Sequence, residues 1–138
     1  MPYATNIIKN IILLSFLIIL HYICTINEKQ TLAVEFADEE LEALIVYHKS
    51  NDKRYKKLKS NATFLKDLDA VMAIIRAATN TSELAYFGRL NYEKLSHDLS
   101  GLSSVRIGYK SKYRLIFEEF DGGIRIKLIE INEHYGDK

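Results

Sequence analysis

The fold is decided by the stretch YEKLSHDLSGLSSVRIGYKSKYRLIF, residues 92–117. Its first residues, 92–96, form a short candidate strand, and a tight connection that contains Gly101 follows. The segments 103–109 and 113–117 then alternate apolar and polar residues. A period of two predicts strands that each bury one face, so these segments form a hairpin with a buried side and a polar side.

The alternation also fixes the parity of the hairpin loop. The apolar sets of the two strands oppose each other only if paired residue numbers have an even sum, which requires an odd number of loop residues. A three-residue loop, Lys110-Ser111-Lys112, is therefore predicted. The same register places Arg106 and Arg114 together on the polar face.

The flanking sequence supplies the other layers of an α+β domain. An alternating strand is predicted at 31–37, and Asp38 is a good N-cap for a helix with an acidic first turn. A second helix is predicted from near Ser60 to Ala78, with a buried stripe at Phe64, Leu68, Val71, Met72 and Ile75. A tight turn at 121–123 leads into a last strand, 124–131, which is apolar enough on both faces to be central. We expect two helices packed on one face of a small, mostly antiparallel sheet.

Length and composition limit the alternatives. A chain of 138 residues supports one domain with a real core, and its single cysteine, Cys24, excludes an internal disulfide and a cysteine-based metal cluster. No metal or cofactor is expected. The net charge is +1, but residues 49–66 carry seven bases against Asp52, and residues 89–114 carry six bases against Glu93 and Asp98. Such blocks create local positive fields, although solvated surface faces are the simpler interpretation of the first block.

Residues 1–30 stand apart from the predicted domain, 31–138. Residues 7–26 are strongly apolar, but the uninterrupted run, 11–20, has ten residues where a membrane span needs about 20. The run suits a signal peptide, yet no Ala-x-Ala cleavage site follows. A single span with His21 and Tyr22 at the interface, or an extension foreign to the domain, are the other interpretations.

Several side chains that can bind phosphate or transfer protons lie on the predicted sheet or directly after it. Metal-free cleavage of RNA is one reaction that uses such groups, because it needs a base for the 2′-hydroxyl, neutralised phosphate charge, a proton for the leaving oxygen and an aligned scissile bond. Arg106 and Arg114 could hold a phosphate, and His134 and Tyr135 follow the last strand, where no packing pattern explains the histidine. Further bases lie nearby: Lys94, Lys110, Lys112 and Arg89.

Each candidate also has a structural interpretation. Arg114 could pair with Glu130 across the sheet, and lysines at a loop tip are usually solvated. Lys94 could simply cover a sheet edge. Tyr109 and Tyr113 are predicted to be core residues, and His48 to be partly buried on a helix stripe.

The ordered set of elements resembles the RelE/ParE superfamily of bacterial toxins, and within it the HigB-like branch. The resemblance runs from about Thr31 to Asp137. It rests on Lys94-Leu95, the connection Leu99-Ser100-Gly101, the segments SVRI (104–107) and YRLIF (113–117), and the terminal element HYGD (134–137). The hairpin is about two residues longer than usual in the branch, and Ser96-His97-Asp98 replaces a Gly-Asp connection.

The resemblance implies a toxin of a two-gene toxin–antitoxin module, as found in plasmid maintenance. Such toxins inhibit translation by hydrolysing mRNA on the ribosome, without a metal, and a cognate antitoxin, here HigA-like with a helix-turn-helix, masks them. By position, Arg106 and Arg114 would contact phosphate, Lys94 would assist, His134 with Tyr135 would transfer protons, and Lys110, Lys112 and Arg89 would bind RNA. The expected location is the cytoplasm, with membrane association only through residues 7–26.

Other functions fit the same fold, because fold alone does not fix function. A ParE-like protein inhibits DNA gyrase without cutting RNA, and an inactive toxin-like binding protein is a further alternative. A membrane-tethered interaction protein would rest on residues 7–26 alone.

Overall fold

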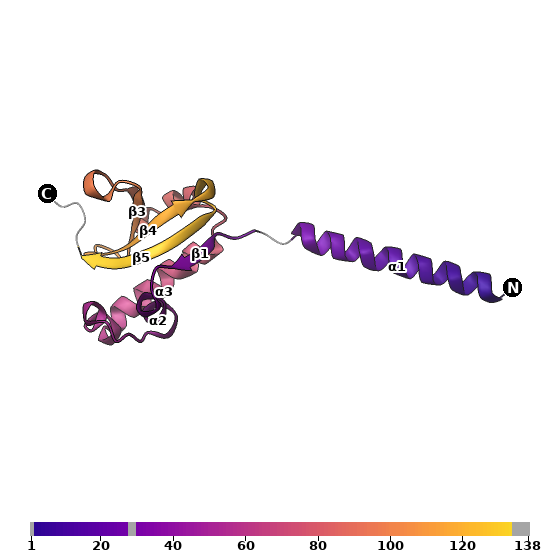
Figure 1. The fold of residues 1–138 in the computed structure, drawn as a ribbon, viewed down its shortest axis with the longest axis horizontal. Helices are drawn as coiled ribbons and strands as arrows, with labels where there is room; N and C mark the ends of the chain where they lie inside the picture. Colours follow the sequence, from indigo (N-terminus) through magenta and orange to yellow (C-terminus); the bar gives the residue numbers. More distant parts are fainter. Residues whose placement is uncertain (1, 28–29, 134–138) are drawn as a thin grey trace. The chain divides into compact units, whose positions relative to one another are not determined.

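The computed structural model describes residues 2–27 and 30–133. The chain divides into two compact units, residues 1–30 and residues 31–138. The second unit contains a five-stranded sheet in the order β1-β5-β4-β3-β2 (Figure 1). Only β1 and β5 run parallel, and the other three pairings are antiparallel, so the predicted α+β fold with a mostly antiparallel sheet is observed.

Strand β1 (Ala33–Phe36) leads directly into helix α2 (Glu39–Tyr47). Asp38 is the N-cap, as predicted, and its carboxylate accepts a hydrogen bond from the Leu41 amide at 2.8 Å. Three glutamates in the first turn favour the same start, because negative charge stabilises a helix N-terminus. The helix ends at His48, which adopts a left-handed conformation.

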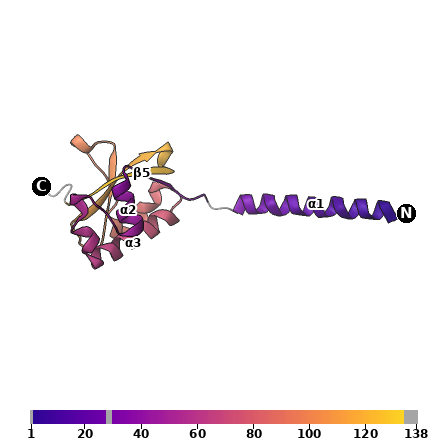
Figure 2. The same ribbon diagram turned by 60° about the horizontal axis from the view of Figure 1, so that its bottom comes forward.

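Helix α3 (Ala62–Ala77) supplies most of the helical side of the core. Asn61 caps it through a hydrogen bond from the Phe64 amide, and all five residues of the predicted stripe are buried. Helices α2 and α3 lie on the same side of the sheet (Figures 1 and 2). The sheet meets them with Val105, Leu115, Phe117, Ile126 and Leu128, each completely buried. These strand residues and the stripe of α3 belong to one hydrophobic core.

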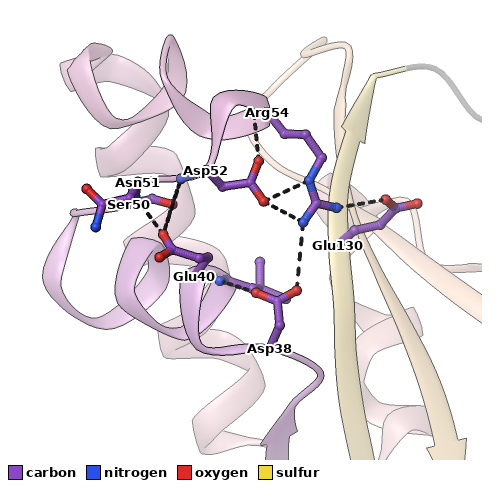
Figure 3. Close-up of polar contacts among 8 residues, drawn as sticks. Asp38, Glu40, Ser50, Asn51, Asp52, Arg54 and Glu130 are labelled. Carbon is purple, nitrogen blue, oxygen red and sulfur yellow. Dashed lines mark hydrogen bonds and ion pairs between the residues drawn. The ribbon is translucent and has the colours of Figure 1, made fainter.

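The segment between α2 and α3 is fixed to α2 and to the sheet by charged side chains (Figure 3). Glu40 accepts hydrogen bonds from the Ser50 hydroxyl and from the amides of Asn51 and Asp52, and these bonds hold the pKa of Glu40 below its ordinary value. Arg54 donates to Asp52 at 2.7 Å and lies 3.8 Å from Glu130 of β5. Two short 3-10 helices, Lys53–Tyr55 and Leu58–Ser60, complete the connection.

The hairpin that decides the fold has the predicted parity but a longer loop. Strands β3 (Leu102–Arg106) and β4 (Tyr113–Phe120) pair Arg106 with Arg114 and Val105 with Leu115. These sums are even, as predicted, but the predicted three-residue loop is wrong. Beyond Arg106, the Ile107 amide still donates to the Tyr113 carbonyl at 2.9 Å, and Gly108 then adopts a φ of 94°, which favours glycine. Five residues, 108–112, therefore form the loop.

The longer loop overturns one core prediction. Tyr109 lies in the loop with 72% of its surface exposed, because the chain leaves the strand one residue before it. Tyr113 is partly buried and packs edge-on against Phe64, with ring centroids 5.1 Å apart. His48 is half-buried, as predicted, and contacts Asp69 at 2.8 Å.

Strand β5 (Arg125–Glu133) lies between β1 and β4, which confirms its predicted central place. The register between β4 and β5 shifts between Ile116 and Phe117. The edge strand β2 is short, Glu93–Lys94. Between α3 and β2 the chain forms two 3-10 helices, Thr81–Tyr86 and Gly88–Leu90, and Gly88 is the first residue of the second one.

Residues 2–27 form one long helix, α1 (Pro2–Asn27). The helix is therefore longer than the uninterrupted apolar run of ten residues, 11–20, which it contains. Within α1, the 20 residues Thr5–Cys24 are long and apolar enough to cross a membrane.

We predict that residues 31–138 fold without the first unit. All five strands of the sheet and helices α2 and α3 belong to this part of the chain. Among the residues whose burial is described, the core begins at Leu32. A chain starting at Thr31 should be soluble and unfold cooperatively with a transition equal to that of the full chain. An unfolded product beside a cooperative full chain would assign residues 1–30 to the core.

Candidate functional site

A buried guanidinium marks the face of the sheet opposite the helices. Arg114 of β4 has a side chain only 7% exposed, although α2 and α3 pack on the other face. Its Nε donates to the Ser104 hydroxyl at 2.9 Å, and its Nη2 donates to the Asn91 carbonyl at 2.8 Å. The same Nη2 lies 2.8 Å from the carboxylate of Glu93. A charge this buried requires such pairing, so the three contacts fix the position of Arg114.

Glu93 was not singled out by the sequence analysis. It pairs with Ser104 in the β2–β3 register, so its side chain shares the face of Ser104 and Arg114. Its side chain is 44% exposed, which leaves the carboxylate accessible while Arg114 holds it. The sequence could have indicated this position of Glu93. Tyr92 packs against the core, and successive side chains of a strand point to opposite faces, so Glu93 must face away from the core.

Arg106 pairs directly with Arg114, so the register puts the two arginines on one face as predicted. Their contacts differ. The Nε of Arg106 is buried and finds no hydrogen-bond partner among residues 2–27 and 30–133. Arg106 and Arg89 both line a cavity of about 320 Å³, whose apolar wall includes Val71, Ile74 and Leu90. Arg106 and Arg89 thus bring two guanidinium groups to the same cavity.

The predicted grouping of Lys94 with the arginines is not observed. Lys94 pairs with Ser103, whereas Glu93 pairs with Ser104, and successive residues of a strand point to opposite faces. Its ammonium lies 3.9 Å from Glu119 on the helix-bearing face. Strand alternation thus separates Lys94 from Arg106 and Arg114.

Glu119 forms a second polar cluster around Lys94. Its carboxylate accepts hydrogen bonds from the Tyr92 hydroxyl at 2.7 Å and the Ser103 hydroxyl at 3.1 Å. Burial raises the pKa of Glu119, but the hydrogen bonds, that of Tyr92 foremost, outweigh it and leave the pKa below its ordinary value. Burial also raises the pKa of Tyr92. These bonds join β2, β3 and β4 beside the core.

We predict that Glu119→Gln removes part of the acid sensitivity of folding. A depressed folded-state pKa contributes stability that is present above the unfolded pKa and is lost as pH falls through the folded value. Above about pH 6, Glu119→Gln should lower the unfolding free energy by about 1–3 kcal/mol. The difference should shrink below about pH 4.5 in urea titrations at several pH values.

Glu118→Gln provides the control for this measurement. Glu118 directly precedes Glu119 in β4, and its side chain therefore faces the other side of the sheet. Its substitution should leave the unfolding free energy nearly unchanged at every pH. Equal effects of the two substitutions would show that the Glu119 cluster has no special role in stability.

The other predicted RNA contacts lie in and beside the hairpin loop. Lys110 and Lys112 are exposed. Lys112 lies 3.2 Å from Glu133, and this hydrogen bond raises the pKa of Lys112. Arg54 lies 3.8 Å from Glu130, and Arg114 lies 2.8 Å from Glu93.

His134 and Tyr135 lie outside the described residues. Strand β5 leads toward them and ends at Glu133, beside Asn132, which pairs with Arg114. Within residues 2–27 and 30–133, no group of three or more His, Cys, Asp and Glu side chains could hold a metal ion.

Comparison with known proteins gives structural similarity without sequence similarity. No family model and no curated protein matches the chain. A YoeB/ParE toxin from Agrobacterium tumefaciens is similar with a TM-score of 0.47 and 15% identity, over 75% of this chain and 100% of that chain. The heterotetrameric YoeB-YefM toxin-antitoxin complex from Staphylococcus aureus is similar with a TM-score of 0.41 and 22% identity, over 75% and 98%. A chain of the toxin-antitoxin complex RelBE2 from Mycobacterium tuberculosis is similar with a TM-score of 0.40 and 15% identity, over 75% of this chain and 99% of that chain.

Proposed function

We propose that this chain is the toxin of a two-gene toxin–antitoxin pair and that it cleaves messenger RNA on the ribosome without a metal ion. The proposal is supported by the ordered sequence elements of residues 31–137, which resemble the RelE/ParE superfamily and its HigB-like branch. The partner would be a HigA-like antitoxin encoded beside it. The messenger RNA target places its action in the cytoplasm.

The observation that carries the proposal is the pair of Glu93 and Arg114. A half-exposed carboxylate held 2.8 Å from a buried guanidinium joins a proton acceptor to a fixed positive charge. Cleavage of RNA by its own 2′-hydroxyl needs both, because the hydroxyl must lose a proton while the phosphate gains charge in the transition state. The pair therefore supplies two of the requirements on one accessible face.

The reaction assigned to the site is an internal phosphoryl transfer. Glu93 accepts the proton of the 2′-hydroxyl, the 2′-oxygen bonds to phosphorus, and the bond from phosphorus to the 5′-oxygen breaks. His134, with Tyr135, returns a proton to the departing 5′-oxygen, since histidine has an unperturbed pKa near neutrality. The products are a 2′,3′-cyclic phosphate and a free 5′-hydroxyl.

The basic residues have separate roles in this proposal. Arg106 contacts the phosphate, because it pairs with Arg114 and lines a cavity together with Arg89. Arg114 positions Glu93 and adds charge through contacts that it already makes. Lys110, Lys112 and Arg89 bind the RNA backbone, where positive charge acts without regard to sequence. Lys94 takes no part, because it lies on the other face of the sheet.

The function is tested by cleavage of ribosome-bound message with the full chain and Arg114 variants. Wild type should cut within the message and leave a 2′,3′-cyclic phosphate. Arg114→Ala should slow single-turnover cleavage by about tenfold or more, and Arg114→Lys should recover part of the rate because it restores the charge. Thermal unfolding of each variant separates lost cleavage from lost folding.

Two results would overturn the proposal. If expression of the wild-type chain stops growth while messages stay intact and DNA gyrase is inhibited, the protein is a ParE-like toxin. If neither growth nor message is affected by the free, folded chain, it is an inactive toxin-like binding protein.

A further inference from the structure

Helix α1 has the length of a membrane span. Its apolar part, Thr5–Cys24, contains 20 residues. At 1.5 Å per residue this part is about 30 Å long, equal to the hydrocarbon thickness of a typical bilayer. None of this segment is buried within the chain.

The apolar surface of α1 surrounds the helix. A helix that packs on a soluble domain has an apolar stripe on one side. In α1, large apolar side chains occupy the consecutive positions 11–14 and 16–20, and at 100° per residue they cover every side. Each is at least 43% exposed. A single protein groove would cover only one side, so this distribution fits a solvent that is apolar all round.

The charged and strongly polar residues of α1 lie toward its ends, and Ser15 is a small polar residue near its middle. Lys9 is the only Asp, Glu, Lys or Arg residue between Thr5 and Cys24, and it lies in the second turn of that segment. A lysine near the end of a span can extend its ammonium to the interface. His21 and Tyr22 lie near the other end, where tyrosine favours the membrane–water boundary.

We propose that α1 crosses a lipid bilayer as a single span and tethers the domain of residues 31–138 to a membrane. A cleaved signal peptide has the same apolar length but needs small residues just before the cleavage site. The end of the apolar segment and the residues after it, ICTINEKQ (23–30), contain no Ala-x-Ala pattern. The segment is therefore retained. This inference stands on α1 alone and does not depend on the proposed RNA cleavage.

The test is membrane insertion of the full chain during synthesis. The chain is translated with inverted bacterial inner-membrane vesicles, in an Arg114→Ala background that limits damage to the template. The vesicles are then extracted with alkaline carbonate, which releases surface-bound proteins. Full-length protein should stay with the vesicles, and it should not sediment when vesicles are omitted.

Paired arginine substitutions identify the bilayer as the partner. Leu14→Arg with Ile18→Arg places two charges at the centre of the segment, where insertion is most costly, and should move at least tenfold more protein to the carbonate supernatant. Thr5→Arg with Asn27→Arg adds the same charge at the helix ends and should leave the protein in the vesicles. A shortened product that lacks the segment would identify a signal peptide instead. Release of the wild-type chain by carbonate, or equal behaviour of the two double variants, would also overturn the proposal.

Discussion

Glu93→Gln should slow single-turnover cleavage of ribosome-bound message by about 10²–10⁴-fold, the usual contribution of a positioned acid or base. The substitution keeps the shape of the side chain and an oxygen that can accept from Arg114. It removes the proton acceptor and also the negative charge opposite the buried Arg114 guanidinium, so the unfolding free energy should fall as well. Cleavage is therefore compared at a temperature at which thermal unfolding shows both proteins to be fully folded, which separates a role in proton transfer from a role in holding β2.

The control for this prediction lies on the same face of the sheet. Glu118 belongs to the same strand and face as Arg114, and it pairs with Leu102 of β3, away from the Glu93–Arg114 pair. Glu118→Gln makes the same chemical change and should leave cleavage within about threefold of wild type, well short of an acid–base loss. The prediction fails if Glu93→Gln cleaves as fast as this control.

A double variant tests whether Glu93 and His134 act together. His134→Ala should cost about as much as Glu93→Gln, because each removes one proton transfer from the same step. Groups that work as a unit are strongly non-additive, so the double variant should be only slightly slower than either single variant. If His134→Ala stays within about threefold of wild type, His134 has no part in the reaction.

The sequence predicted the layers of the domain because its periodic patterns are strong. The five-residue stripe of α3, the N-cap Asp38 and the even parity of the hairpin are all observed. All three depend on short-range geometry. The stripe follows the 3.6 residues per helical turn, the parity follows the two-residue repeat of a strand, and the cap is a hydrogen bond between residues three apart. The loop length was missed because parity allows three or five residues equally, and the positive φ at Gly108 decided between them.

The candidate site was less predictable because it depends on partners distant in sequence. Arg114 contacts Asn91 and Glu93, more than 20 residues earlier, and no local pattern links them. Lys94 was grouped with the arginines by its type and position in the chain. The register of the two-residue strand β2 places it on the other face, and so short a strand carries little periodic signal.

Phe117→Ala should lower the unfolding free energy by about 3–5 kcal/mol, the usual cost of deleting a fully buried aromatic side chain. Phe117 is completely buried at the centre of the sheet, paired with Ser103 on one side and Leu128 on the other. It stacks on Tyr92 with ring centroids 6.2 Å apart. Because Phe117 is buried on all sides, deleting its ring leaves a cavity that the surrounding residues fill only in part.

Phe87→Ala is the matched comparison, because it deletes the same side chain from a surface position that is 47% exposed. This substitution should cost about 1 kcal/mol or less, since little area is removed from water there. Urea unfolding followed by circular dichroism measures both values at neutral pH. Equal losses for the two variants would mean that Phe117 does not lie in a closely packed core. A large loss for Phe117→Ala with unchanged chemistry at Glu93 would instead show that the core fixes stability while the polar face is free to serve the reaction.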